Sequence, residues 1–323
     1  MKKLSDITQA VRSELGIFDN KFKLALKSRV PLLDKISYYI VKTKGKQFRP
    51  MISLLVGKMI GQINEKSYSA AMLIELLHTA TLVHDDVVDH AYQRRGFFSI
   101  NALWKNKIAV LVGDYLLSRG LLTALENKHF DLLELLSVAV KEMSEGELLQ
   151  LEKSRQLNIT EEVYYQIIRQ KTASLITAAC SCGAKAVGAT EQQLELIALF
   201  GEKLGLAYQI KDDLMDINQD ASGKPKILDI KEKKLTLPLI YALSQAPASQ
   251  SKEIIKGIRK RSEDPEVIRN TLNFIFEYQG DKYAEKQMHL YRDQAITYLD
   301  SFEMNESKQA LLDLCVFVTE RHS

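Results

Sequence analysis

Two acidic clusters of the same form are the residues of this chain best suited to chemistry. Asp85-Asp86-x-x-Asp89 and Asp212-Asp213-x-x-Asp216 share the pattern D-D-x-x-D. In an α-helix, positions i and i+4 lie on one face about 5–6 Å apart, so the first and last aspartates of each cluster project together. Crowded carboxylates repel one another unless a cation neutralises them. Oxygen-only ligands suit hard divalent ions, and Mg²⁺ is favoured where phosphate oxygens complete its shell.

Both clusters fall at the C-terminal end of a long apolar stretch. Residues 74–83 precede the first cluster and residues 204–210 precede the second. The helix macrodipole disfavours carboxylates at a helix C-terminus, so six of them in two such places indicate a compensating ion. A solvated acidic face would explain one cluster more readily than two. An EF-hand is excluded, because neither cluster carries the glycine and glutamate of that loop.

Basic and polar residues gather around the two clusters. Lys46 and Arg49 stand at a loop-to-helix junction, where backbone N–H groups add donors for an anion. His78 precedes Asp85 by two helical turns and is either a core histidine or a diphosphate donor, whereas His84 is expected to be structural. Taken singly, each base would be an ordinary solvated side chain, but together they indicate an anionic ligand. The other members are Arg94, Arg95, Lys171, Thr172, Gln209, Lys224 and Lys234.

Composition limits the class of protein. Hydrophobic residues make up 46% of the 323 positions, enough for a sizeable core, and a net charge of only +3 argues against a nucleic-acid-binding surface. Three cysteines, Cys180, Cys182 and Cys315, form no paired framework and indicate reduced thiols in a cytoplasmic protein. The sequence shows no signal peptide and no apolar run long enough to predict a transmembrane helix.

The elements that hold these residues are predicted to be helices. No proline occurs between Pro50 and Pro225, and amphipathic runs fill that interval, which favours an all-α fold. The run 191–217 is apolar on most of its circumference and should lie in the middle of a bundle. A polar loop is expected over 218–234, and the lack of a linker predicts a single domain over 1–323. The predicted helices are 3–15, 30–43, 48–61, 65–90, 101–126, 130–155, 160–187, 191–217, 236–245, 249–261, 265–278, 280–301 and 306–320.

These motifs resemble those of the trans-isoprenyl diphosphate synthases of the long-chain, or polyprenyl, type. Residues 75–89 followed by Arg94-Arg95-Gly96 resemble the first aspartate-rich region of that family, and residues 201–216 resemble the second. Between about residues 40 and 245, further motifs match in order and spacing. They are Gly113-Asp114-Tyr115-Leu116, Gly146-Glu147-Leu148, Lys171-Thr172-Ala173 and Lys234-x-Thr236-x-Pro238.

The resemblance implies a bundle of long antiparallel helices around a central cavity (the isoprenoid synthase fold), usually as a homodimer. It implies Mg²⁺ bound by Asp85, Asp86, Asp89, Asp212 and Asp216. Mn²⁺ is a possible substitute for Mg²⁺ at these ligands. Asp213 and Lys171 complete the implied catalytic set. Isopentenyl diphosphate would be held by Lys46, Arg49, His78 and Arg95. The allylic diphosphate would be held by Arg94, Lys171, Thr172, Gln209, Lys224 and Lys234.

The implied reaction lengthens an allylic prenyl diphosphate. Loss of diphosphate leaves an allylic cation in a dry cavity, the double bond of isopentenyl diphosphate attacks it, and the departing diphosphate takes the proton. Ala80 and Thr81 are small at positions where bulky aromatic residues in this family stop the product early. We therefore expect a medium- to long-chain all-trans product of the kind used in quinone side chains. Phe97-Phe98 is a candidate for product or membrane contact, with transient membrane association releasing the product.

Other functions stay open on the sequence. A short-chain farnesyl or geranylgeranyl diphosphate synthase is one alternative. A class I terpene cyclase or head-to-head synthase shares the aspartate-rich helices but generally lacks the second cationic pocket. The chain could also be one subunit of a heteromeric synthase, catalytic or not, although inactive subunits tend to lose one acidic cluster and both are intact here.

Overall fold

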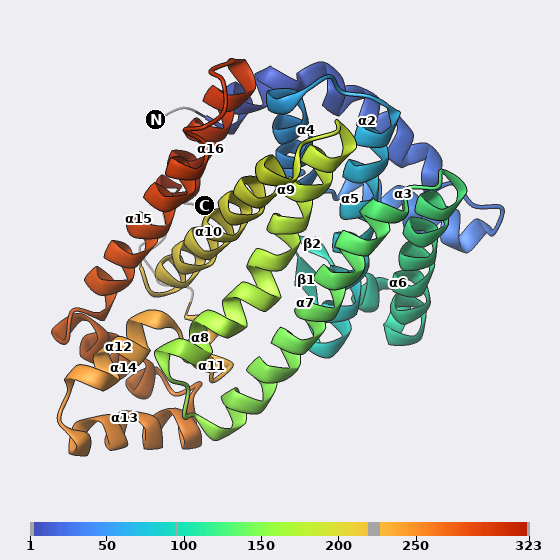
Figure 1. The fold of residues 1–323 in the computed structure, drawn as a ribbon. Helices are drawn as coiled ribbons and strands as arrows, with labels where there is room; N and C mark the ends of the chain where they lie inside the picture. The colour runs from blue at the N-terminus through green and yellow to red at the C-terminus, as the bar shows by residue number, and fades with distance from the viewer. Residues whose placement is uncertain (1–2, 95, 219–226, 322–323) are drawn as a thin grey trace.

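The computed structural model describes residues 3–94, 96–218 and 227–321, which form a bundle of α-helices (Figure 1). The predicted all-α fold class is confirmed. Four long helices, α5 (Glu65–Val88), α6 (Ile100–Glu126), α7 (Phe130–Gln156) and α10 (Glu191–Ile217), make the body together with the shorter α9 (Ser174–Ala186). The other helical segments are α1 (Leu4–Ile7), the 3₁₀ turn η1 (Thr8–Val11), α2 (Arg12–Ala25), α3 (Pro31–Lys42), α4 (Phe48–Ile60), α8 (Glu161–Ile168), the π-helical turn η2 (Arg169–Ala173), α11 (Leu228–Lys231), α12 (Leu237–Gln245), α13 (Ala248–Arg261), α14 (Pro265–Glu277), α15 (Gly280–Tyr298) and α16 (Glu306–Glu320).

Helix α10 runs through the bundle, as its apolar circumference predicted (Figure 1). It packs against α9, α15 and η2, and Phe200, Leu204 and Ile210 are fully buried. Each such side chain contributes about 1.5–3 kcal/mol when fully buried. A capping box between Thr190 and Gln193 starts the helix. The second acidic cluster therefore stands on one of the most firmly packed elements of the molecule.

Two glycines let neighbouring helices approach closely. A Cβ built on Gly183 of α9 would lie 2.1 Å from the backbone oxygen of Ser53 on α4. A Cβ on Gly205 of α10 would lie 2.6 Å from Ala173 at the end of η2. No side chain fits in either place, so these glycines set the spacing of α4, α9 and α10.

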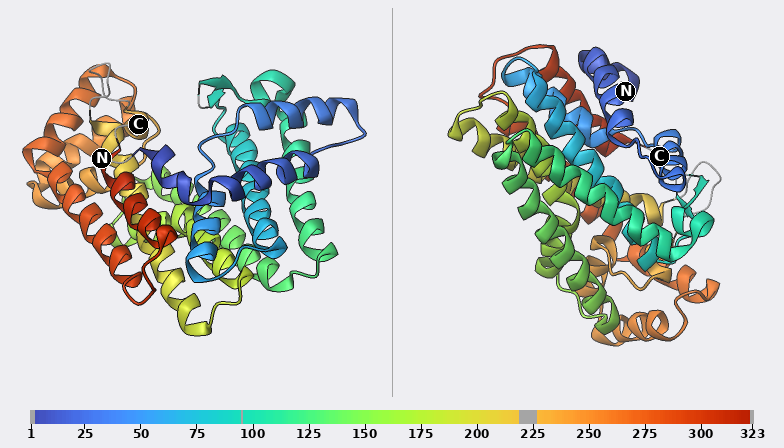
Figure 2. Two further views of the ribbon diagram at one scale, coloured as in Figure 1. Left: turned by 90° about the horizontal axis from the view of Figure 1, so that it is seen from above. Right: turned by 90° about the vertical axis from the view of Figure 1, so that its right-hand side faces the viewer.

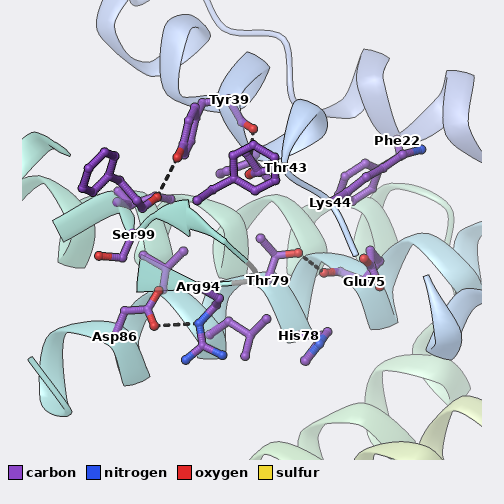
Figure 3. Close-up of a pocket in the computed structure, with 16 residues that line it drawn as sticks. Phe22, Tyr39, Thr43, Lys44, Glu75, His78, Thr79, Asp86, Arg94 and Ser99 are labelled. Atoms are coloured by element: carbon purple, nitrogen blue, oxygen red, sulfur yellow. Dashed lines mark hydrogen bonds and ion pairs between the residues drawn. The ribbon is translucent and has the colours of Figure 1, made fainter. Parts of the chain in front are cut away.

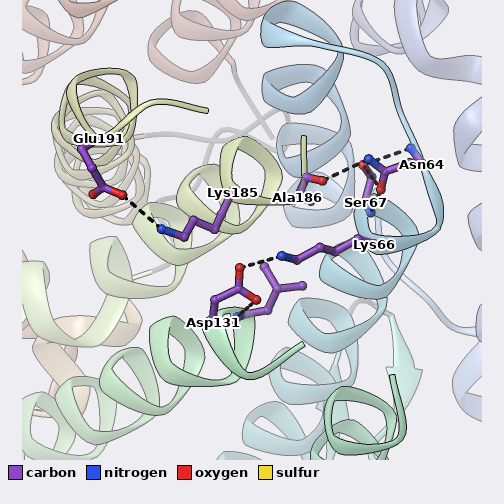
Figure 4. Close-up of polar contacts among 8 residues, drawn as sticks. Asn64, Lys66, Ser67, Asp131, Lys185, Ala186 and Glu191 are labelled. Atoms are coloured by element: carbon purple, nitrogen blue, oxygen red, sulfur yellow. Dashed lines mark hydrogen bonds and ion pairs between the residues drawn. The ribbon is translucent and has the colours of Figure 1, made fainter. Parts of the chain in front are cut away.

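Helices α5 and α10 begin at the same end of the bundle (Figure 4). There Asn64, the N-cap of α5, donates to the carbonyl of Ala186 at 3.0 Å, and Lys185 pairs with Glu191 at 3.3 Å. Lys66 in the first turn of α5 pairs with Asp131 of α7 at 2.6 Å. The two helices have 24 and 27 residues and are thus about 36–40 Å long. They carry the two acidic clusters to the opposite end of the bundle at similar heights.

At the end that carries the clusters, a short hairpin follows α5. Strands β1 (Gln93–Arg94) and β2 (Phe97–Phe98) pair antiparallel, and the Tyr39 hydroxyl of α3 donates to the carbonyl of Phe98 at 2.6 Å. Figure 2 shows α2 and α3 projecting from the bundle as a helical hairpin (dark blue) near these strands.

Several predicted boundaries were wrong. The N-terminal helix does not end at residue 15, since α2 continues to Ala25. The π-helical turn η2 divides the predicted helix 160–187, and the β-hairpin was not predicted. The predicted loop 218–234 contains the short helix α11 in its described part, while residues 219–226 lie outside the described residues.

One described helix, α6, is long and apolar enough by length and composition to cross a membrane, which the sequence analysis did not anticipate. In this fold α6 packs along α5 and is a bundle helix. Several leucines on it remain exposed, including Leu111 and Leu121.

Candidate active site

The first acidic cluster forms the end of α5. Asp89 is the C-cap residue, and its N–H donates to the carbonyl of Asp85 at 2.8 Å. Asp86 is 3% exposed, and its carboxylate accepts a 2.6 Å bond from Nε of Arg94 on β1 (Figure 3). Asn101 of α6 donates to the Asp86 carbonyl at 3.0 Å. The hairpin thus folds back so that Arg94 lies over the cluster.

Asp85 sits in an electrostatically unfavourable place. Burial, followed by repulsion from Glu147, raises the pKa of Asp85 to about 6, and Asp89 adds to the rise while Lys171 and Arg94 oppose it. A carboxyl in such surroundings gains from an approaching cation, since an opposite charge favours its ionised form. Asp85 therefore has the properties of a metal ligand.

His84 is structural, as the sequence analysis expected. Its Nε2 lies 3.2 Å from the carbonyl of Val110 and 3.5 Å from the Asp114 carboxylate on α6. A Cβ on Gly113 would lie 2.1 Å from His84 Nε2, so only glycine leaves room for the imidazole. The Gly113-Asp114 motif therefore sets how α6 supports the end of α5.

The second acidic cluster is bound by protein donors. Asp213 is 3% exposed and accepts from the Tyr164 hydroxyl at 2.6 Å and from Gln209 at 2.9 Å. Burial, with repulsion from Asp229, raises the pKa of Asp213 well above its usual value. Asp212 pairs with Arg321 at 2.5 Å.

Asp216 organises the chain beyond the cluster. Its two carboxylate oxygens accept from the N–H groups of Leu228 and Asp229 at 3.0 and 3.1 Å. Its carbonyl accepts from the N–H of Ile227 at 3.0 Å. Asp216 therefore holds the start of α11 next to the cluster.

Asp229 is a site residue that the sequence analysis missed. Burial, followed by repulsion from Asp216, raises the pKa of Asp229 to about 7. The charges of Lys234 and Lys171 oppose that rise, so both bases face Asp229. The sequence gives little indication of this role, because Asp229 is a single aspartate in a polar loop and belongs to no recognisable motif.

Lys171 lies on the π-helical turn η2. Its Nζ is 2.6 Å from Glu147 and 2.6 Å from Gln150, both on α7. A Cβ on Gly146 would lie 2.8 Å from the Lys171 backbone nitrogen, so that glycine lets α7 meet the turn. The close approach at Gly146 thus brings Glu147 of this motif, and Gln150 one turn further along α7, to the lysine.

Four of the six predicted allylic-diphosphate residues meet in one cavity: Lys171, Thr172, Gln209 and Lys234. Thr172 donates to Gln209 at 2.8 Å, and Lys234 pairs with Glu232. The cavity has a volume of about 100 Å³, and its polar lining consists of Gln150, Ser154, Tyr164, Lys171, Thr172, Gln209, Asp213, Asp229, Lys234 and Thr236. Arg94 instead lines the neighbouring pocket of Figure 3 together with Asp86 and His78.

Three of the four predicted isopentenyl-diphosphate residues meet in a second cavity of about 560 Å³. Lys46, Arg49 and His78 line it. Arg49 Nη1 lies 2.9 Å from His78 Nε2 and, being only a donor, requires that nitrogen to accept. Arg321 and Tyr208 also line this cavity, and the guanidinium lies 4.0 Å from the Tyr208 ring centroid. Sequence reasoning missed Arg321, which nothing in its local sequence distinguishes.

Two predicted ligands, Arg95 and Lys224, lie outside the described residues. The chain-length residues differ in setting. Ala80 has no exposed surface and belongs to the main apolar cluster. Thr81 is partly exposed, and its hydroxyl donates to the His78 carbonyl at 2.9 Å.

The donor set fits a hard divalent ion. Among residues 3–94, 96–218 and 227–321, no three acidic, histidine or cysteine side chains already surround a common point. The fit rests on the chemistry of the donors, because carboxylate oxygens are the ligands that hard divalent ions prefer. Asp85 and Asp89 would serve from the first cluster, with Asp212 and Asp216 from the second, whereas the predicted ligand Asp86 is buried and paired with Arg94.

Comparison with known proteins agrees with this geometry. The chain is 34% identical over 298 residues to octaprenyl diphosphate synthase of Escherichia coli, covering 92% of each chain. It is 33% identical to an all-trans-nonaprenyl-diphosphate synthase of Rhodobacter capsulatus, covering 98% of this chain and 97% of the other. The solved decaprenyl diphosphate synthase of Rhodobacter capsulatus superposes with a TM-score of 0.94 at 31% identity, covering 99% and 100%.

A second solved structure is a polyprenyl synthase of Caulobacter crescentus complexed with calcium and isoprenyl diphosphate. It superposes with a TM-score of 0.91 at 30% identity, covering 99% of this chain and 98% of the other. The family profile described as polyprenyl synthetase matches residues 30–275. With two acidic helix ends and two cationic cavities in one all-α bundle, the chain belongs to the polyprenyl synthetase family.

Proposed function

We propose that this protein is a Mg²⁺-dependent trans-polyprenyl diphosphate synthase that condenses isopentenyl diphosphate with an allylic diphosphate. One observation carries the proposal: the bases around the two acidic clusters divide between two cavities. Lys171, Thr172 and Lys234 line one, and Lys46, Arg49 and His78 line the other. Two diphosphates bound at separate places are what a chain-elongating enzyme needs. A cyclase, which has a single diphosphate substrate, needs only one.

The cation set of the first cavity serves the departing diphosphate. Charge builds on the leaving oxygens as the allylic carbon–oxygen bond breaks. Lys171 and Lys234, together with Arg94 above Asp86, are fixed donors that stabilise this charge by preorganisation. Bound Mg²⁺ would supply Lewis-acid stabilisation of the same oxygens.

The second cavity keeps its diphosphate. Lys46, Arg49 and His78 hold isopentenyl diphosphate so that its double bond faces the allylic carbon, and this proximity replaces a bimolecular encounter. Apolar walls exclude the water that would quench the cation. The leaving diphosphate, still held by Lys171, accepts the proton when the new double bond forms.

We propose a medium- to long-chain all-trans product that serves as a quinone side chain. The octaprenyl, nonaprenyl and decaprenyl names of the relatives support this length. Small residues at Ala80 and Thr81 support it further. Reversed-phase chromatography of the products from isopentenyl diphosphate and an allylic primer tests it, and a product that stops at C15 would overturn it. Because Ala80 is fully buried, Thr81→Phe is the gentler variant, and we expect it to shorten the product.

One relative, 31% identical over 329 residues, is named heptaprenyl diphosphate synthase component 2, which favours a second candidate. In that candidate the chain is the catalytic subunit of a heteromeric synthase. Activity of the purified chain alone, with Mg²⁺ and an allylic primer, decides between the two. Turnover only after a second subunit is added would establish the heteromer.

A homodimer would cover an exposed apolar face. Large apolar side chains stand exposed on α6 and α7, and a patch of this kind marks an interface. They include Leu103, Leu111, Leu121, Leu122, Leu125 and Leu148. Sedimentation of the wild type and of Leu121→Lys tests this assembly, and a monomeric wild type would overturn it.

Placement in the cytoplasm is supported by three buried thiols without disulfide partners in the described residues. Transient membrane association during product release is supported by exposed Phe97 and Phe98 on the β-hairpin. Fractionation of cells tests both, because the chain should be found with the soluble fraction and partly with membranes. A chain recovered only from an exported fraction would contradict the cytoplasmic placement.

A further inference from the structure

We infer that Glu147 is a positioning residue that, together with Gln150, directs the Lys171 ammonium at the departing diphosphate. This inference rests on the proposed function, since it concerns the same cavity. Glu147 itself does not line that cavity, whereas Lys171 and Gln150 do. Its action on a ligand there would pass through the lysine.

The geometry fixes the direction of the ammonium. A lysine ammonium has three N–H donors. Glu147 Oε2 and Gln150 Oε1 each lie 2.6 Å from Lys171 Nζ. Because these acceptors stand three residues apart, they share one face of α7. With a hydrogen bond to Gln150 and an ion pair with Glu147 on the α7 side, the ammonium is held at the cavity that Lys171 and Gln150 line.

The backbone supports the same arrangement. Gly146, next to Glu147, lets α7 approach η2 until a Cβ would lie 2.8 Å from both Gln170 Cβ and the Lys171 nitrogen. The π-helical turn presents Lys171 at this contact. A flexible side chain that would otherwise lose rotamer entropy on binding is thus ordered before the substrate arrives.

Lys171 also stands between the two clusters. Its charge acts on Asp85 of the first cluster and on Asp229 beside the second. Glu147 acts on Asp85 in the opposite sense. An ammonium held between the clusters would contact a diphosphate that bridges ions bound at the two clusters.

Two roles of Glu147 make opposite predictions. If Glu147 orients Lys171, the Glu147→Gln variant keeps an acceptor for the lysine and should keep most of the pyrophosphate affinity. The Glu147→Ala variant has no acceptor and should lose that affinity. If its negative charge instead competes with diphosphate for Lys171, both variants bind diphosphate more tightly. Calorimetric titration with inorganic pyrophosphate and Mg²⁺ separates these cases without requiring turnover.

We expect Glu147→Ala to weaken pyrophosphate binding about tenfold, the size of a lost hydrogen bond to a charged group, and Glu147→Gln to restore most of that loss. Kinetics should show a lower kcat with an unchanged KM for isopentenyl diphosphate. Glu145→Gln is the matched control, because Glu145 lies on the same helix and pairs only loosely with Lys141 at 3.8 Å. Tighter pyrophosphate binding by both Glu147 variants would overturn the inference.

A double-mutant cycle gives the decisive comparison. In a Lys171→Gln background, Glu147→Ala should have no further effect on pyrophosphate binding, because it acts through the lysine. Additive losses would overturn the inference. A wild type that binds pyrophosphate with Mg²⁺ but fails to incorporate isopentenyl diphosphate would instead defeat the proposed function and leave this cycle interpretable.

Discussion

The two acidic clusters have the same pattern but different surroundings. In the second, each aspartate accepts from the protein: Asp212 from Arg321, Asp213 from Tyr164, and Asp216 from backbone N–H groups of α11. In the first, Asp86 accepts from Arg94, but Asp85 faces charges on other helices, and repulsion from Glu147 contributes to the raised pKa of Asp85. The difference shows that an identical motif can be arranged chiefly to receive a cation at one helix end and to organise the chain at the other.

The largest effect should come from the first cluster. Asp85→Asn removes a metal-facing carboxylate, so we expect turnover to fall by about 10²–10³-fold, the cost of losing one preorganised electrostatic group. The melting temperature should not fall, because burial already penalises the charge of Asp85. Radiolabelled isopentenyl diphosphate incorporation and thermal denaturation measure the two quantities. Asp300→Asn on the surface is the control, and a melting temperature lowered in Asp85→Asn alone would show that this cluster is structural too.

A scaffold residue of the second cluster should affect stability. Tyr164→Phe leaves buried Asp213 without its 2.6 Å hydroxyl donor. The free energy of unfolding should fall by about 1–3 kcal/mol, the cost of an unsatisfied buried group. Urea denaturation measures this change against Tyr92→Phe, a substitution at an exposed tyrosine. Equal stability of the two variants would contradict the distinction between the clusters.

Arg321 tests whether the second cluster must exchange a protein partner for an ion. Arg321→Ala releases Asp212 from its ion pair, so Mg²⁺ should bind up to about tenfold more tightly in the presence of pyrophosphate. The KM for isopentenyl diphosphate should rise, because Arg321 lines the second cavity. Calorimetry and initial rates measure these changes, with exposed Arg12→Ala as the control. Unchanged Mg²⁺ affinity would mean that Arg321 does not compete with the ion.

The smallest effect should be the pH dependence of stability without metal. The folded-state pKa values of Asp85 and Asp229 are raised from 3.8 to about 6 and about 7. The folded state therefore binds more protons than the unfolded state between about pH 4 and pH 7, and stability contributed by these groups is lost as pH rises through that window. We expect the melting temperature to be several degrees lower at pH 7.5 than at pH 5 in metal-free buffer.

Asp229→Asn should flatten this dependence, and Mg²⁺ with pyrophosphate should reverse it. Thermal denaturation at the two pH values measures both. A melting temperature that rises with pH in metal-free wild type would contradict the unfavourable ionisation of these two carboxyls.

Much of the fold could be predicted from hydrophobic periodicity, because a helix as long and as apolar as 191–217 is stable only in the middle of a bundle. The residues of the site also followed from sequence, since repeated aspartates with flanking bases form a specific pattern. The features that could not be predicted are tertiary contacts between residues far apart in the sequence. Arg321 reaches Asp212 from more than 100 positions away, and Asp229 is defined by its burial against Asp216. The π-helical turn at Lys171 depends on contact with Gly146, which no local pattern reports.

The π-helical turn has a consequence for protein engineering. A π turn holds one residue more than the α-helical turn it replaces. The extra residue is absorbed within the turn, so α8 and α9 keep the register that they would have in one continuous helix. Deleting one residue of this turn would restore α-helical winding and leave both flanking helices in place, but it would change the direction in which Lys171 projects. Grafts and chimeras of this helix must therefore conserve its residue count before its sequence.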